Sequence, residues 1–350
     1  MWIYWLICAI TIVISYIGSI CIIKVNGYEI KNDSTKILFT SLPLIIIASI
    51  RYGIGSDYFN YEKFFNLINN GYDRFELLFT WMNRGIHFLG LNFQAFIVIT
   101  SIAFTLLVIL SIYHDSPNVA YSIFLLFAMG FFFQSLNIIR QMLACAICLY
   151  SIKYVEEKKP IRFIICIVLA IGFHSASIIF APVYLFFNIK IDLKKVISIL
   201  IAVFLLQWKI VDIVVEYGKG VLNYQDYFRN LNADANVGYV SLIINILIYI
   251  FAYVFIDKEN KSERGFLNLQ LIALALSLLN GQIPLLNRLR FYYALPGIIL
   301  IPIAINNVKN KSLRTWLYVI IGVLFFAYCM YIEGYMNQSA TFPYMTIFDQ

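Results

Sequence analysis

Long apolar runs of about 20 residues recur along the chain, separated by short polar stretches. As a helix, a run of this length crosses the hydrocarbon core of a bilayer. The runs are continuously apolar rather than alternating, which predicts helices and not a β-barrel. Only 13% of the residues are charged, about half the share found in soluble domains. The sequence therefore predicts an all-α polytopic integral membrane protein, a helical bundle that forms one membrane-embedded domain over residues 1–350.

The apolar runs predict about ten to twelve membrane segments. The first, from Trp2 to Ile23, lacks a basic n-region and a small-residue cleavage site, so we expect a retained helix rather than a signal peptide. Residues 161–188 are interrupted by GFHSAS and by Pro182, and they can form one long tilted helix or a broken, re-entrant hairpin. The remaining candidate spans are residues 37–50, 92–112, 118–135, 137–154, 196–215, 239–256, 266–281, 292–306 and 315–332.

Lysine-rich loops favour the hairpin. By the positive-inside rule such loops lie in the cytoplasm, and all five can do so only if residues 161–188 return to the side on which they start. Both termini then face outward, and the outer loops 51–91, 216–238 and 282–292 are expected to form the active site. The lysine-rich loops are Lys24–Lys36, Lys153–Arg162, Lys190–Lys195, Lys258–Arg264 and Lys309–Arg314.

Arginine and lysine divide unequally between the two faces of this topology. The cytoplasmic segments hold 13 lysines and 3 arginines, whereas the outer segments hold 3 lysines and 7 arginines. A topology signal needs positive charge of either kind, so it does not explain an outer face built from arginine. Arginine presents a planar fork of donors that grips phosphate through two hydrogen bonds. The outer face is therefore predicted to bind an anion.

The stretch RYGIGSDYFNYEKFF follows the second span and carries the first candidate site residues. Arg51 is a candidate catalytic anion ligand and Asp57 a candidate general base, while Tyr61 offers a ring and a hydroxyl to a sugar. Gly53 and Gly55 permit an unusual backbone path but do not form a phosphate loop. The alternative interpretation is an interfacial loop with its tyrosines at headgroup level.

The segment YDRFELLFTWMNRGIHFLG has apolar residues at helical spacing, interrupted by charged ones. It predicts an amphipathic helix that lies on the outer surface. Glu76 in this segment is a candidate substrate-binding residue. Arg84 and His87 are expected at the membrane interface.

The motif SLNIIRQMLA places Asn137, Arg140, Gln141 and Ala144 at i, i+3, i+4 and i+7, which is one face at the outer end of a membrane helix. A polar face at that depth must meet water, protein or ligand. Arg140 is therefore a candidate catalytic residue and Gln141 a candidate substrate-binding residue. The alternative for Arg140 is a structural ion pair with a loop carboxylate.

His174 lies at the predicted break of the hairpin, where non-helical backbone requires a polar cavity. It is a second candidate catalytic base, with a packing role as the alternative. The adjacent Ser175 is not expected to form a dyad with it, because neighbouring helical residues point apart.

Two further outer segments supply candidate substrate-binding residues. Tyr227 and Arg229 belong to the longest outer loop. Arg288, Arg290 and Tyr292 belong to PLLNRLRFYY, where the two arginines project apart if the segment is helical and share one side if it is extended.

No metal or cofactor is expected at the outer face. The single acidic pair with D/E-x-D/E spacing, Asp257 and Glu259, lies in a cytoplasmic loop, and no H-E-x-x-H motif is present. The six cysteines all lie in apolar runs and are interpreted as small core residues. The basic residues lie in the short loops between spans and do not cluster, so no nucleic acid is expected as a partner.

Five motifs resemble, in order along the chain, those of the EpsG-like branch of the Wzy-type polysaccharide polymerases. The resemblance implies a GT-C-like fold and assembly of bacterial surface polysaccharide (O-antigen, capsule or exopolysaccharide) on the outer leaflet of the plasma membrane. It also implies substrates carried on undecaprenyl pyrophosphate, with Arg51, Asp57, Tyr61, Arg140, Gln141 and His174 as the matching site positions. The motifs are RYGIGSDYFNY, NIIRQMLACAICLYSIKY, GFHSASIIF, RFYY and PYMTIF.

Together these features predict a metal-independent membrane glycosyltransferase that polymerises lipid-linked repeat units. Its expected partners are the undecaprenyl-pyrophosphate-linked glycan as donor and acceptor and the lipid bilayer, with a chain-length regulator protein as a further candidate. A polysaccharide ligase would use similar site chemistry. A lipid-linked oligosaccharide transporter (flippase) is the alternative from another class, and it predicts charges along a path through the whole bilayer.

Overall fold

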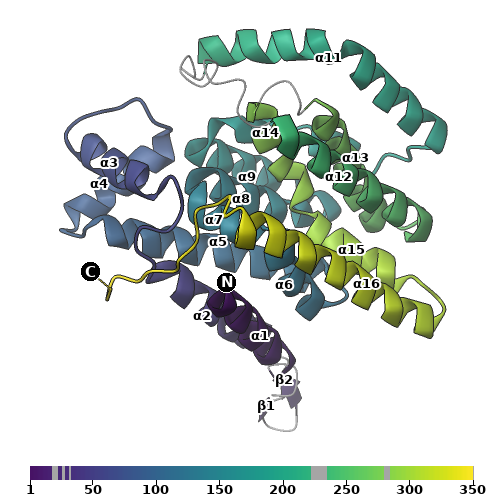
Figure 1. The fold of residues 1–350 in the computed structure, drawn as a ribbon, viewed down its shortest axis with the longest axis horizontal. Coiled ribbons are helices and arrows are strands. Elements are labelled where there is room, and N and C mark those ends of the chain that lie inside the picture. The colour runs from purple at the N-terminus through teal and green to yellow at the C-terminus, as the bar shows by residue number, and fades with distance from the viewer. Residues whose placement is uncertain (18–22, 26–27, 31–32, 222–234, 280–283, 350) are drawn as a thin grey trace.

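Helices make up most of the computed structural model (Figure 1), which describes residues 1–17, 23–25, 28–30, 33–221, 235–279 and 284–349. Two short strands, β1 (Ile23–Val25) and β2 (Tyr28–Ile30), pair antiparallel after the first helix. The helices are α1 (Trp2–Ile17), α2 (Asp33–Ser49), α3 (Tyr58–Asn69), α4 (Leu77–Phe88), α5 (Phe93–Asp115), α6 (Val119–Ala128), α7 (Phe131–Asn137), α8 (Ile139–Glu156), α9 (Pro160–Phe173), the 3₁₀ helix η1 (Ser175–Phe180), α10 (Val183–Phe186), α11 (Leu193–Val221), α12 (Ala235–Phe255), α13 (Lys261–Leu278), α14 (Pro284–Ala294), α15 (Gly297–Asn306), α16 (Lys311–Cys329) and the π-helix η3 (Met330–Tyr335).

Several of these helices could cross a membrane. Within the described residues, three stretches are long and apolar enough: Phe93–Asp115, Arg288–Asn306 and Lys311–Tyr335. A bent pair of helices brings the number to four, and five more apolar helices of 10–17 residues are shorter. The all-α membrane class is therefore supported, whereas the expected ten to twelve segments are met only in part by length and composition.

One predicted span is bent rather than continuous. Residues 118–135 form α6 and α7, which are bent by 55° relative to each other. Gly130 sits at the bend with φ of +84°, in the left-handed region that a residue without a Cβ enters most easily. Apolar periodicity continues across the glycine, so the sequence pattern did not reveal the bend.

Residues 161–188 begin and end at the same end of the bundle. Glu156, just before α9, hydrogen bonds with Ser262 at the start of α13. After the return through η1 and α10, the carbonyl of Asn188 accepts two hydrogen bonds from Arg264 on the same α13 (3.2 and 2.9 Å). This is the geometry that the hairpin interpretation requires. We call the end of the bundle at which residues 161–188 begin and end the lysine-rich end. It is formed by residues 114–118, 156–160, 188–192, 256–264 and 306–311.

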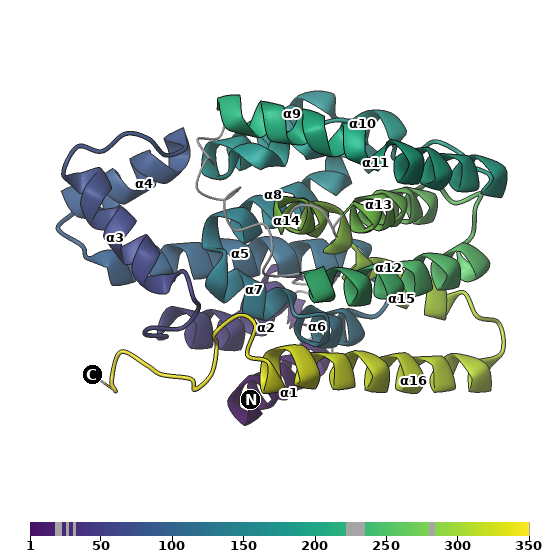
Figure 2. The same ribbon diagram turned by 45° about the horizontal axis from the view of Figure 1, so that its top comes forward.

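The opposite end is covered by α3 and α4, which both views place together at one end of the bundle (Figures 1 and 2). Their buried aromatic residues form a second core with the first turns of α5 and α8. The predicted amphipathic helix is confirmed as α4, which buries Phe79, Asn83 and Ile86 and exposes Trp81 and Phe88. In contrast, α3 was not expected, because its stretch was interpreted as a loop.

The C-terminal segment after η3 returns to the stretch that begins at Arg51. The backbone N–H of Gly55 donates to Ala340 (2.9 Å), and that of Tyr52 donates to Met345 (2.9 Å). A bridge between Arg51 and Thr346 continues this pairing. The first and the last of the five motifs, RYGIGSDYFNY and PYMTIF, are far apart in sequence but adjacent in the fold.

Candidate functional site

A pocket of about 270 Å³ lies where α3, the start of α8, the break after α9 and α14 meet. It is at the end of α8 away from the lysine-rich end, so the two regions are separated by about 25 Å of helix at 1.5 Å per residue. The lining combines two arginines, a carboxylate, an imidazole and two carboxamides with a few rings. The lining residues are Asp57, Asn60, Tyr61, Phe64, Ile138, Arg140, Gln141, His174 and Arg288.

The turn before α3 positions Asp57 at the pocket. Gly55 has φ of +97°, and a Cβ on it would lie only 2.7 Å from the carbonyl oxygen of Leu136. The close approach lets the Asn137 side chain accept hydrogen bonds from the Asp57 N–H (3.1 Å) and the Ser56 hydroxyl (3.0 Å). Gly55 of RYGIGSDY therefore serves this contact, and not a phosphate loop.

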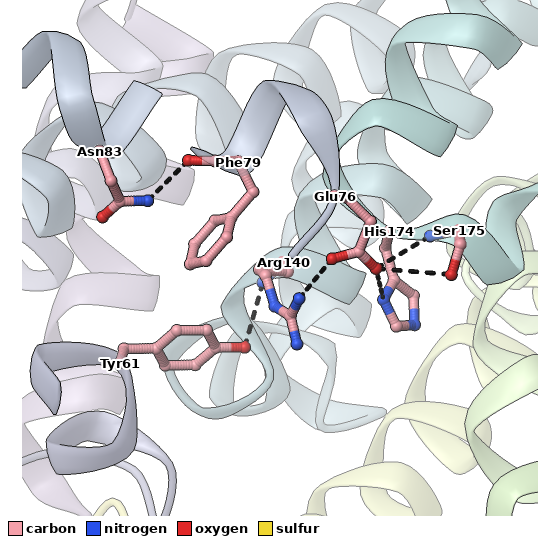
Figure 3. Close-up of polar contacts among 7 residues, drawn as sticks. All are labelled: Tyr61, Glu76, Phe79, Asn83, Arg140, His174 and Ser175. Atoms are coloured by element: carbon pink, nitrogen blue, oxygen red, sulfur yellow. Dashed lines mark hydrogen bonds and ion pairs between the residues drawn. The ribbon is translucent and has the colours of Figure 1, made fainter. Parts of the chain in front are cut away.

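Glu76 joins two of the candidate catalytic residues (Figure 3). One carboxylate oxygen accepts from the guanidinium of Arg140 (2.5 Å), and the other lies 3.5 Å from Nδ1 of His174. The second oxygen also accepts from the N–H and the hydroxyl of Ser175 (3.2 and 3.4 Å). At 3.5 Å the histidine contact is longer than an ordinary hydrogen bond, and catalytic contacts of this kind commonly shorten when substrate binds.

The charge states of this group follow from its surroundings. Burial raises the pKa of Glu76, but the close contact with His174 and the charge of Arg140 outweigh it and hold that pKa at about 2. Burial lowers the pKa of His174 below its usual value, against the opposing effect of Glu76. At neutral pH the group is therefore a carboxylate, a guanidinium and a neutral imidazole, whose other ring nitrogen points away from Glu76 in Figure 3.

Aromatic residues of the α4 segment hold the Arg140 side chain. Its guanidinium carbon lies 5.4 Å from the ring centre of Phe75 and 5.0 Å from that of Phe79. The Arg140 N–H also donates to the hydroxyl of Tyr61 (3.3 Å). The apolar spacing that predicted α4 thus supplies the surface on which the guanidinium is packed.

A hydrogen bond connects the start of α8 to α14. Gln141, 3% exposed, donates its amide to the carbonyl of Arg288 (2.5 Å). The side chain of Arg288 then lines the same pocket as Arg140. The predicted positions Arg140, Gln141 and Arg288, which lie on two distant segments, are thus brought together.

The arginine excess of the outer face predicts that Arg51, Arg140 and one or both of Arg288 and Arg290 share one pocket, and the structure corrects this prediction. Arg51 is 1% exposed and lines a separate cavity of about 10 Å³, where its guanidinium donates to the Ala48 carbonyl and to Ser101. Arg290 lines a different cavity together with Glu333. Since α14 is helical, Arg288 and Arg290 project apart, which was one of the two predicted alternatives.

The remaining candidates lie elsewhere. Tyr292 is 1% exposed, one turn after Arg288, and does not line the pocket. Arg84 pairs with Asp73 at the exposed surface of α4. The candidates Tyr227 and Arg229 lie outside the described residues, and the expected loop 216–238 is helical at both of its described ends.

The structure adds residues that sequence reasoning missed. Asn60 and Phe64 line the pocket from α3, one and two turns after Asp57, and helical spacing would have found them had α3 been expected. Asn137 was expected on one helical face with Arg140, but it ends α7 and accepts a hydrogen bond from the backbone N–H of Asp57. Its partner is 80 residues away, so the sequence held no local signal for this role.

A profile of the EpsG family matches residues 35–346, which is most of the chain. No match was found among the curated proteins or among the solved structures.

Proposed function

The chain belongs to the EpsG family, and we propose that it is a membrane glycosyltransferase that polymerises oligosaccharide repeat units carried on undecaprenyl pyrophosphate. Family membership indicates a polymerase-like role in polysaccharide biosynthesis, and the apolar helices indicate a membrane protein. The GT-C-like architecture, and the use of the lipid-linked glycan as both donor and acceptor, belong to the proposal. So does the chain-length regulator as an accessory partner.

One observation carries the proposal: Arg140 and His174 share the carboxylate of Glu76 beside a pocket that Arg288 and Asp57 also line. The pocket thus combines cations for a leaving pyrophosphate with bases for an attacking hydroxyl. It adjoins α4, whose exposed apolar side chains suit contact with lipid.

The reaction forms one bond and breaks one. A hydroxyl oxygen of the acceptor glycan attacks the anomeric carbon of the donor, and the bond from that carbon to the pyrophosphate oxygen breaks. The electron pair leaves with undecaprenyl pyrophosphate. The hydroxyl proton passes to a base on the enzyme. The leaving group gains negative charge in the transition state, and this charge must be stabilised.

The residues have distinct roles in this scheme. Arg140 and Arg288 stabilise the charge that develops on the pyrophosphate, which is worth roughly 3–4 kcal/mol per well-placed donor. His174, neutral and oriented by Glu76, is positioned to take the proton, and Asp57 is the second candidate base. Tyr61 and Gln141 hold the groups around the pocket. No step in this scheme requires a metal.

The location of the polar groups supports an outer-leaflet site. The pocket lies at one end of α8, and lysine-rich turns gather at the other end. With those turns in the cytoplasm, the pocket faces outward in the bacterial plasma membrane.

The proposal is tested by incubating purified protein with lipid-linked repeat units in detergent and resolving the products by size. We expect the unaltered protein to produce a ladder of polymers. The ladder should disappear in His174→Ala if His174 is the base, and in Asp57→Asn if Asp57 is the base. Asp73→Asn, which removes an exposed carboxylate outside the pocket, is the matched control. Transfer of glycan to a different acceptor without a ladder would indicate a ligase. Movement of the lipid across vesicles without any transfer would indicate a transporter.

A further inference from the structure

Two carboxylates and an imidazole converge at the lysine-rich end of the bundle. His114 and Asp115 end α5, and Glu156 ends α8. One ligand atom from each residue lies within 4.8 Å of the others. Nδ1 of His114 is 2.5 Å from Asp115 and 4.0 Å from Glu156. The predicted outer site uses none of these residues.

The carboxylates are placed where negative charge is unfavourable. Both occupy the last turn of a helix, where the peptide dipoles already present negative charge. They also face each other, and the Asp115 side chain is only 4% exposed. Within the described chain, the ion-pair partner of each is His114. Nearby Lys153 instead places its ammonium 3.9 Å from the ring centre of Tyr150.

Glu156 has side-chain hydrogen bonds with Ser262 and Asp115, yet one of its two oxygens has no hydrogen-bond partner of ordinary geometry among the described residues. Oε1 of Glu156 is buried and accepts no hydrogen bond within the limits of ordinary geometry. A cation between the three side chains would satisfy this oxygen, screen the two carboxylates from each other and complement both helix ends. The electrostatics and the orphaned oxygen are independent indications of the same missing positive charge.

We propose that His114, Asp115 and Glu156 form a binding site for a divalent transition metal ion. An imidazole with two carboxylates suits Mn²⁺ or Zn²⁺ better than Mg²⁺ or Ca²⁺, which prefer oxygen ligands alone. Water would complete the coordination, because the His114 side chain is 43% exposed at the surface. The bound ion joins the ends of α5 and α8, two helices that both begin near the pocket. Its role is to stabilise the bundle.

The test measures the unfolding temperature of tag-free protein in detergent, first stripped with EDTA and then titrated with Mn²⁺, Zn²⁺ or Mg²⁺. We expect Mn²⁺ or Zn²⁺ to raise the midpoint by at least about 3 °C, because a ligand that binds only the folded state stabilises it. His114→Ala and Glu156→Gln should each abolish the rise. His87→Ala, which alters another exposed histidine near a helix end, should keep it.

Equilibrium dialysis adds a readout that does not depend on unfolding. We expect one equivalent of metal per protein for the unaltered chain and none for Glu156→Gln. No rise with either transition metal, or an equal rise in His114→Ala, would overturn the site and leave a cluster that shares a proton. Polymer formation does not enter either readout, so this result is independent of the proposed function.

Discussion

Arg140 fulfils both of the roles that its sequence position allowed, a residue of the site and a member of a structural ion pair. It forms an ion pair with the loop carboxylate of Glu76, and it also lines the pocket. The two roles are compatible because Glu76 engages one terminal nitrogen of a fork that carries five N–H donors. The ion pair therefore positions the guanidinium beside the pocket that it lines.

Replacing Arg140 tests whether the planar fork matters. Lysine keeps the charge but loses both the fork and the stacking on Phe75 and Phe79. We expect Arg140→Lys to lower the rate of polymer formation about 10²-fold, nearly as far as Arg140→Ala. Arg84→Lys, at the exposed surface of α4, should remain near the unaltered rate. A fully active Arg140→Lys would limit this residue to carrying charge.

Glu76→Gln has a pH-dependent signature. Because the folded-state pKa of Glu76 lies below its usual value of 4.5, its carboxylate stabilises the fold above pH 4.5 and loses this effect as the pH falls towards 2. The variant should therefore unfold at a lower temperature than the unaltered protein at pH 7. The difference should narrow as the pH falls below about 4.5. If the two proteins differ in unfolding temperature by the same amount at all pH values, the loss of stability does not come from the ionised Glu76 carboxylate.

The same variant should also shift the pH–rate profile. The Glu76 carboxylate raises the pKa of His174, whose net pKa is nonetheless lowered by burial. Without the carboxylate the pKa of His174 falls further, so the acid side of the profile should move to lower pH. If this limb stays in place while the overall rate falls, His174 is not the base that titrates.

At the level of secondary-structure elements, the turn before α3 connects the pocket to the core. Gly55 approaches the end of α7 so closely that no side chain fits, whereas Gly71, after α3, has a similar positive φ with nothing within 4 Å of an added Cβ. The two glycines share the left-handed backbone and differ in the close approach, so Gly71 serves as the control for Gly55.

Gly55→Ala should reduce both stability and activity. The left-handed backbone costs about 1–2 kcal/mol in either alanine variant, but only Gly55→Ala also forces α3 away from α7. We expect a larger fall in unfolding temperature and a loss of polymer formation for Gly55→Ala, and near-normal polymer formation for Gly71→Ala. Equal effects in the two variants would show that backbone strain alone matters.

At the level of the whole molecule, the hairpin of residues 161–188 determines which loops share a side. The described cysteines are buried, so single cysteines can be introduced at exposed positions once Cys21 is replaced. We expect Lys159→Cys and Lys190→Cys to react with an impermeant reagent only from the cytoplasmic side, and Asn70→Cys only from outside. Labelling of positions 159 and 190 from opposite faces would contradict the hairpin.

The sequence by itself determined the all-α membrane class, the amphipathic α4 and the identity of several pocket residues. These follow from local quantities: apolar run length, helical periodicity and the position of charged residues along a helix. Asp57, Tyr61, Arg140, Gln141 and His174 were all found in this way, because polar side chains in apolar surroundings stand out.

Only the tertiary structure decided which of the arginines share a pocket. Arg51 and Arg140 have equivalent local settings in sequence, yet one is enclosed by Ala48 and Ser101 and the other lines the pocket. Arg140 and His174 are brought together by Glu76, which lies 64 residues before the arginine and 98 residues before the histidine along the chain. Such convergence depends on how helices pack and where they bend, as at Gly130, and no local pattern encodes it.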